Sequence, residues 1–307
     1  MSFDIGNVLT RAWQITWKNR VFWIFALLPF VIWMLYIPLF MLAFFWGDLT
    51  NPTSTPFFKM IDDPASETLL GVGYIAIVLV ALVIQVFANA ALTLGAVRAE
   101  AGTEKQGFGE VFKASLPYVG RIFGAYLLIG IAVTIIFVIF MGCMFAVNFI
   151  TMGIGALFLQ FLLYPIMFGA WIVVEQSLAA IIAEEMTATE AIGRAWDLLT
   201  SHIWKFLLVG VLIYIAQAIA SAIVTFPMMI PLWGLMYSSI NIESAPSTAS
   251  LLVAMLCMVA LIPLYLFVMG ISKTFTRSVF VVLYRLFTRD SEARQELLKV
   301  IASQETK

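Results

Sequence analysis

Residues 187–210, TATEAIGRAWDLLTSHIWKFLLVG, decide the fold, because they lead from a short amphipathic helix directly into an apolar one. Thr187 followed three residues later by Glu190 is typical of a capping box, which predicts that a helix begins here. Apolar residues then recur at helical spacing, and polar residues become rare from Trp204 onward. The stretch therefore predicts a helix in the membrane interface that continues into a membrane span.

The same pattern occurs near the N-terminus, in residues 1–20, and in the middle of the chain, in residues 98–121. A basic residue followed by alanine recurs in the three stretches, at Arg11, Lys113 and Arg194. We therefore predict three copies of one unit, each made of an interfacial helix, an outward span and a return span. The alternative is that any protein built from hydrophobic hairpins carries basic and aromatic residues at its membrane flanks.

The composition places the chain in a membrane. Hydrophobic residues make up 63% of the sequence and charged residues only 11%, whereas charged residues are about a quarter of a typical soluble domain. The apolar residues come in runs that are long enough to cross a bilayer as helices. The predicted fold class is all-α: a polytopic helical membrane protein.

Six transmembrane helices are predicted, and both termini are expected to be cytoplasmic. The spans cover about 21–45, 69–97, 122–147, 154–183, 205–226 and 249–271. Pro227 and Pro231 should end the fifth span, and the second half of the sixth helix should either leave the membrane or bend at Gly270. Residues 1–288 would then form a single membrane domain, followed by a charged cytoplasmic tail, 289–307.

The distribution of positive charge predicts the orientation. With six spans, every Lys and Arg except Lys59 falls on the same side of the membrane. The positive-inside rule then makes that side cytoplasmic. Cations on this side are candidates for contact with anionic lipid headgroups, and the set is Arg11, Lys18, Arg20, Lys113, Arg121, Arg194 and Lys205.

The return spans carry polar side chains well inside their apolar runs. These residues are Gln85, Asn89, Glu175, Gln176, Lys273 and Arg277. If the return helices pack side by side, the six form a polar layer in the cytoplasmic half, where Glu175 pairs with Lys273 or Arg277. This layer would be a substrate or ion site. Alternatively, the spans are shorter, and these side chains reach water at the inner interface.

Motifs for catalysis, metals and cofactors are missing from the sequence. One histidine, His202, and two cysteines, Cys143 and Cys257, are too few for a metal cluster or a histidine-based triad. No Walker-type phosphate loop, complete dinucleotide fingerprint or GxSxG elbow is present. We therefore predict no enzyme activity, no metal and no cofactor. The expected partners are the lipid bilayer, anionic headgroups and a membrane protein, and no nucleic acid is expected.

Four stretches resemble one known family. They are DIGNVLTRAWQITWKNRVFWIF (4–25), FGEVFKASLPYVGRIFG (108–124), EAIGRAWDLL (190–199) and TFTRSVFVVLYRLF (274–287). Together they are similar to the membrane domain of glycerophosphoryl diester phosphodiesterases and to its uncharacterised stand-alone six-span bacterial relatives, over nearly the whole chain. In the named enzymes this domain precedes a soluble catalytic barrel. The residues after Phe287 in this sequence are too few for such a barrel. The resemblance implies the fold and a prokaryotic cytoplasmic membrane, but not the phosphodiesterase activity or its metal ligands.

Two functions stay open at this point. The first is a non-enzymatic scaffold or accessory protein that handles lipids or a partner protein. It predicts that removing the charge of Arg11, Lys113 or Arg194 impairs function, whereas Glu175→Gln leaves function intact. The second is a small-solute, ion or lipid transporter, which predicts a water-accessible cavity at Glu175. An intramembrane enzyme is the weakest idea, because Glu175 is its one candidate acid.

Overall fold

The described part of the chain is helical. The structure, a computed structural model, describes all residues except 1–3, 31–63, 104–105, 152–153, 242–247 and 306–307. These described residues form helices joined by short turns and contain no strand. The all-α prediction is therefore confirmed.

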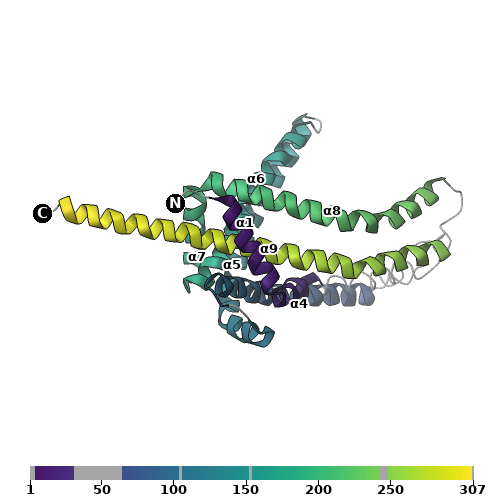
Figure 1. Ribbon diagram of the computed structural model, residues 1–307. Helices are drawn as coiled ribbons and strands as arrows, with labels where there is room; N and C mark the ends of the chain where they lie inside the picture. Colours follow the sequence, from purple (N-terminus) through teal and green to yellow (C-terminus); the bar gives the residue numbers. More distant parts are fainter. Residues whose placement is uncertain (1–3, 31–63, 104–105, 152–153, 242–247, 306–307) are drawn as a thin grey trace. The chain divides into compact units, whose positions relative to one another are not determined.

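The helices follow one another along the chain in a simple order (Figure 1). Their bounds are α1 Ile5–Lys18, α4 Pro64–Glu100, α5 Phe108–Thr151, α6 Ile154–Ala183, α7 Ala188–Ser201, α8 Ile203–Asn241 and α9 Thr248–Glu305. A short apolar helix, Val21–Phe30, follows α1. The bounds of α6 coincide with those predicted for the fourth span.

Five segments of the described residues are long and apolar enough to cross a membrane. They are Ile75–Glu100, Phe108–Thr151, Phe161–Ala183, Ile203–Pro227 and Val259–Arg289. Large apolar side chains are exposed along them, which suits contact with lipid and not with water. The chain is therefore a polytopic helical membrane protein. Most of the first predicted span, 21–45, lies outside the described residues.

Three helices are longer than the spans that the sequence predicted. α5 joins the expected interfacial segment to the third span, with Pro117 inside the helix. α8 passes through Pro227 and Pro231, which we expected to end the fifth span. α9 continues through most of the predicted tail, 289–307, and ends at Glu305. Membrane helices tolerate proline because neighbouring groups satisfy the freed carbonyls, so proline is a weak stop signal in this chain.

The chain forms two compact units, each assembled from separate stretches. The first contains Met1–Asn19, Ala90–Ile213 and Phe275–Lys307, and the second contains Arg20–Asn89 and Tyr214–Thr274. In the first unit, α5, α6 and α7 contact one another. In the second, the ring of Trp23 packs edge-to-face on that of Phe267, with 5.6 Å between the ring centres.

α1 and α7 are amphipathic helices of equal length, 14 residues, and they bury the same four positions. These are Val8, Ala12, Ile15 and Thr16 in α1, and Ala191, Ala195, Leu198 and Leu199 in α7. The spacing of three and four residues puts each set on one stripe of its helix. Away from this stripe each helix exposes a tryptophan: Trp13 is 47% exposed and Trp196 is 57% exposed.

The capping box predicted at the start of α7 is confirmed. The carboxylate of Glu190 accepts hydrogen bonds from the Thr187 hydroxyl at 2.8 Å and from the Thr187 backbone N–H at 3.0 Å. Both bonds stabilise the ionised carboxylate, the hydroxyl more strongly, and they therefore lower the pKa of Glu190. In α1 the N-cap is Asp4, whose carboxylate accepts from the backbone N–H of Gly6 at 2.8 Å.

Candidate functional site

An ion pair is buried in the first unit. Glu175 of α6 and Arg277 of α9 lie 2.7 Å apart, from Oε2 to Nη1, and they are 8% and 3% exposed. Of the two partners that the sequence offered to Glu175, the structure selects Arg277. The ammonium of Lys273, in the second unit, lies 5.9 Å from the ring centre of Phe30. Glu175 and Arg277 are enclosed by protein, unlike cations and carboxylates that reach water at a helix end.

The contact between α6 and α9 around this pair is both polar and aromatic. Gln176 donates from Nε2 to the carbonyl oxygen of Phe280 at 3.3 Å. The ring of Trp171 packs edge-to-face on that of Phe280, with 5.1 Å between the centres. Gln176 is fully buried, and its Oε1 has no hydrogen-bond partner among the described residues. This contact therefore holds charged, amide and aromatic groups in one buried region.

The predicted polar layer is divided between the two units. The structure brings Glu175, Gln176 and Arg277 together in the contact of α6 with α9. The other three residues belong to the second unit, where Gln85 is exposed, Asn89 is buried and Lys273 is half-buried. A single layer of all six side chains therefore stays a prediction.

Two glutamates that follow α6 connect it to other elements of the first unit. Glu184 accepts a hydrogen bond from the hydroxyl of Tyr284, and its Oε2 lies 4.0 Å from Nε of Arg194. Glu185, two residues after the end of α6, has a φ of 55°, and its carbonyl oxygen accepts from Nη1 of Arg121 at 2.7 Å. Two predicted headgroup contacts, Arg121 and Arg194, are thus close to acceptors of the protein itself. The sequence does not reveal these acceptors, because partners so far apart in the chain leave no local pattern.

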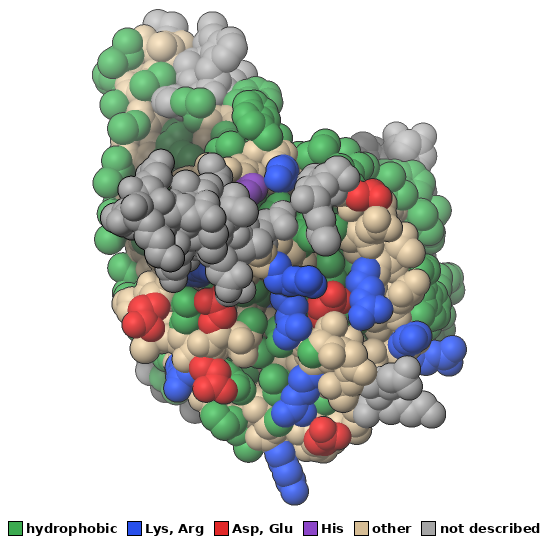
Figure 2. Space-filling model, turned by 60° about the vertical axis from the view of Figure 1, so that its left-hand side comes forward, with side chains coloured by type: hydrophobic (Ala, Val, Ile, Leu, Met, Phe, Trp, Pro, Cys, Tyr) green, Lys and Arg blue, Asp and Glu red, His purple; other side chains and the backbone are tan. Residues whose placement is uncertain are grey.

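The other predicted headgroup contacts differ in exposure. Arg20 and Lys113 are exposed, while Lys205 is half-buried and has its ammonium 5.4 Å from the ring centre of Phe287. Figure 2 shows Lys and Arg side chains, in blue, interspersed with Asp and Glu, in red, on the face that it turns forward. Arg20 and Lys113 are therefore open to an external anion.

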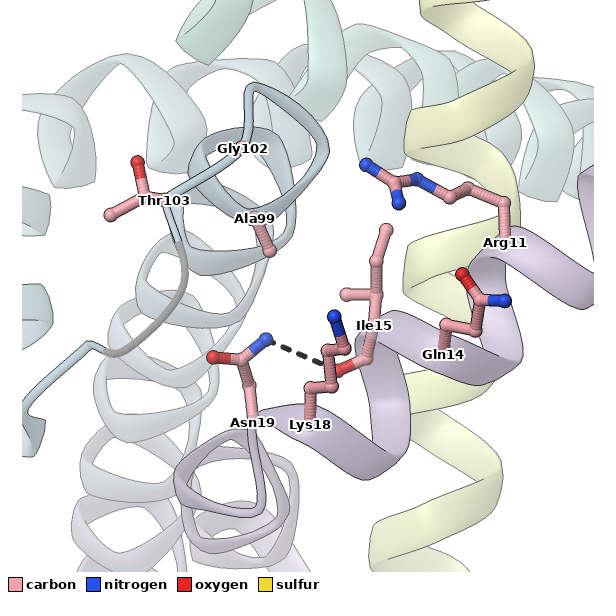
Figure 3. A pocket seen from close by; sticks show the side chains of 8 residues that line it. All are labelled: Arg11, Gln14, Ile15, Lys18, Asn19, Ala99, Gly102 and Thr103. Carbon is pink, nitrogen blue, oxygen red and sulfur yellow. Dashed lines mark hydrogen bonds between the residues drawn. The ribbon is translucent and has the colours of Figure 1, made fainter.

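A pocket of about 130 Å³ lies beside α1 (Figure 3). One wall comes from α1 and its C-cap, through Arg11, Gln14, Ile15, Lys18 and Asn19. The other wall comes from the end of α4 and the turn after it, through Ala99, Gly102 and Thr103. Arg11 also donates from Nε to Oε2 of Glu100 at 3.0 Å. The pocket thus unites two of the predicted headgroup contacts, Arg11 and Lys18, with residues that the sequence analysis did not single out.

The described residues also contain candidate metal ligands and thiols. Within them, no group of three or more His, Cys, Asp or Glu side chains lies close enough to hold a metal ion. Cys143 and Cys257 are exposed free thiols. The absence of a cofactor stays a prediction from the sequence.

Comparisons with known proteins find no relative: no family model, no curated protein and no solved structure matches the chain. The resemblance to the phosphodiesterase membrane domain therefore stays a prediction from the four stretches. The geometry itself offers two features that carry charge, the buried ion pair between α6 and α9 and the basic pocket beside α1.

Proposed function

We propose that the protein is a non-enzymatic accessory or scaffold protein of the membrane that binds anionic lipids through its amphipathic helices. The observation that carries this proposal is the shared design of α1 and α7. Each helix buries one stripe against the protein and exposes tryptophan elsewhere, at Trp13 and Trp17 in α1 and at Trp196 in α7. Exposed tryptophan beside Lys or Arg is typical of a helix that lies among lipid headgroups.

The same two helices support the proposed internal repeat. Besides their length and buried stripe, they carry an arginine at the same position, Arg11 in α1 and Arg194 in α7. Each arginine lies near a glutamate at the end of a membrane helix: Nε of Arg11 is 3.0 Å from Glu100, and Nε of Arg194 is 4.0 Å from Glu184. We infer that α1 and α7 are equivalent parts of a repeated unit.

The proposed orientation puts these helices in the cytoplasmic leaflet of a prokaryotic membrane. The support is the distribution of positive charge: in a six-span chain, all Lys and Arg residues except Lys59 would lie on one side of the membrane, which the positive-inside rule makes cytoplasmic. That leaflet attracts basic segments, with about 1 kcal/mol for each Lys or Arg near its surface. Lipid binding at α1 and α7 would then hold the protein, and a partner protein with it, at an anionic part of the membrane.

Lipid retention by the purified protein tests this proposal. In mixed micelles with equal amounts of anionic phosphatidylglycerol and zwitterionic phosphatidylcholine, native mass spectrometry counts the lipids that stay on the chain. We expect preferential retention of phosphatidylglycerol, and Lys113→Gln should weaken this preference about fivefold through loss of one surface cation. Glu110→Gln removes an acid from the same helix and should leave the preference at least as strong. Equal retention of both lipids by the unmodified protein would contradict the proposal.

A transporter that uses the polar interior is the second candidate. It is favoured by the buried pair of Glu175 and Arg277 and by the buried Oε1 of Gln176, because polar and ionisable groups inside a membrane protein often mark a substrate pathway. Lipid binding is preferred because the pocket beside α1 is lined by Arg11 and Lys18, and by neither member of the buried pair. Water access to the interior of α6 separates the two functions.

A further inference from the structure

We propose that the pocket beside α1 binds the phosphate of an anionic phospholipid, a phosphodiester whose outer group carries no positive charge. The proposal rests on lipid binding as the function of the protein. It adds the place of one site, the chemistry of its headgroup and the residue that supplies the deciding charge, Lys18.

The wall from α1 is a row of nitrogen donors. Arg11, Gln14 and Lys18 follow one another at intervals of three and four residues, which puts them on one face of the helix over about two turns. In Figure 3 the ends of the Arg11 and Lys18 side chains reach into the space between α1 and the turn that holds Gly102. A phosphate in that space would meet two cations and an amide.

The opposite wall is a glycine turn that closes α4. Gly102 has a φ of 100°, a conformation that glycine adopts without strain. Its N–H donates to the carbonyl oxygen of Ala99 at 3.2 Å, and the N–H of Thr103 donates to that of Arg98 at 3.0 Å. These bonds occupy carbonyl oxygens whose partial negative charge would otherwise repel an anion. The small side chain of Ala99 leaves the pocket open.

The charge balance of the pocket selects the ligand. Arg11 is paired with Glu100 at 3.0 Å, so these two charges largely cancel. Lys18 makes no ion pair within the described residues, and it therefore gives the pocket one net positive charge. A phosphodiester carries a single negative charge, whereas a phosphomonoester carries nearly two at neutral pH. A choline or ethanolamine outer group would bring another cation next to Arg11 and Lys18, so a glycerol-type headgroup fits best.

The position of the pocket indicates a lipid and not a dissolved phosphate as the source. The apolar segment Ile75–Glu100 ends at the residue that binds Arg11, directly beside the pocket. Trp13 and Trp17, on the same helix as the donors, are exposed and pack edge-to-face with 5.4 Å between their ring centres. Exposed tryptophans at the end of an apolar span are typical of the headgroup level. The volume of about 130 Å³ is several times the ~30 Å³ of one water molecule, enough for a phosphate.

Native mass spectrometry of the full chain in the mixed micelles described above tests the site. We expect Lys18→Gln to weaken retention of the most tightly bound phosphatidylglycerol about tenfold, because a hydrogen bond to a charged group is lost. Ala99→Leu fills the pocket while every charge stays, and the same loss is expected. Glu110→Gln, which lies outside the pocket, is the control and should leave the tightest lipid in place. An excess of inorganic phosphate should not displace it.

The outcomes separate the site from the general function. If the unmodified protein prefers phosphatidylglycerol but Lys18→Gln and Ala99→Leu retain it as tightly as Glu110→Gln does, the pocket is not the site, and lipid binding as the function stands. If the unmodified protein shows no preference, the function and the site fail together. Displacement of the lipid by inorganic phosphate would assign the pocket to a soluble phosphate and overturn the lipid as its ligand.

Discussion

Glu175→Gln is expected to lower the free energy of unfolding by about 3–5 kcal/mol, because it leaves the buried charge of Arg277 without its carboxylate. The guanidinium of Arg277 lies 2.7 Å from Glu175 and is 3% exposed, so water does not replace the lost partner. An arginine does not escape this cost by losing its proton, because a guanidinium stays protonated in proteins. Equilibrium unfolding in mixed micelles, with a rising fraction of a denaturing detergent, measures the loss.

Two further variants make this test specific. Glu110→Gln is the same chemical change in an exposed pair, where Glu110 lies 3.3 Å from Arg98 and its side chain is 60% exposed; a loss of about 0–1 kcal/mol is expected there. The double variant Glu175→Gln with Arg277→Met buries no charge, so most of the lost stability should return. The buried ion pair would be contradicted if Glu175→Gln and Glu110→Gln lowered the free energy of unfolding equally. It would also be contradicted if the double variant recovered no stability.

This result changes one expectation from the sequence. Glu175→Gln was predicted to leave the function of a lipid-binding scaffold intact, because Glu175 was not needed for headgroup contact. The structure makes Glu175 a structural partner of Arg277, so the variant weakens the fold whatever the function is. Its effect on function is therefore informative only alongside its measured stability.

Gly210→Leu is expected to destabilise the protein by about 1–3 kcal/mol through overpacking. Gly210 lies where α8 passes close to α6: a Cβ added there would be 2.6 Å from Cζ and 3.2 Å from Cε1 of Phe168, and 3.5 Å from Cδ1 of Ile172. A leucine adds three more carbons to this contact, so the ring of Phe168 must move or the helices must separate. Unfolding in mixed micelles again measures the effect.

Gly130 of α5 supplies the matched control. A Cβ added at Gly130 meets nothing within 4 Å, and replacing a glycine inside a helix by leucine improves helix propensity by up to about 1 kcal/mol. Gly130→Leu should therefore be neutral or stabilising. Adding Phe168→Ala to Gly210→Leu should relieve the clash and recover part of the loss. If both leucine variants were equally stable, the close approach of α8 to α6 would be wrong.

Local signals in the sequence predicted local structure well. The capping box of Thr187 and Glu190 placed the start of α7, because its hydrogen bonds join residues three apart. Proline predicted helix ends poorly, as Pro227 and Pro231 within α8 show, because helices in a membrane are held by their surroundings as much as by their own sequence.

The alignment of the middle copy of the proposed repeat shows the limit of pattern matching. In α1 the buried residues Val8 and Ala12 bracket Arg11, and in α7 the buried Ala191 and Ala195 bracket Arg194 in the same way. In α5 the buried residues of that spacing are Val111 and Ser115, so the matching position is Ala114 and not Lys113. The predicted alignment of the three copies follows the basic residues, whereas burial follows the apolar stripe.

The site was predicted only in part, for a similar reason. The spacing of cations in residues 1–20 singled out Arg11 and Lys18, which line the pocket. Gly102 and Thr103 had no signal of their own, because the turn that carries them is brought to α1 by folding. Glu175 was recognised as a group that needs a partner, but the choice of Arg277 over Lys273 depends on side-chain directions that a sequence does not contain.

Thiol access to position 177 tests most directly whether the protein works at its lipid-facing surface or through a polar interior. Ser177 of α6 is fully buried two residues from Glu175, and Ser201, at the end of α7, is exposed. With Cys143 and Cys257 replaced by Ala, Ser177→Cys and Ser201→Cys would be treated with a charged maleimide in nanodiscs, where both membrane faces are open to the reagent. We predict rapid labelling at position 201 and none at position 177. Labelling at position 177 as fast as at position 201 would show that water reaches the space between the helices. That result would contradict the lipid-binding account and would support transport.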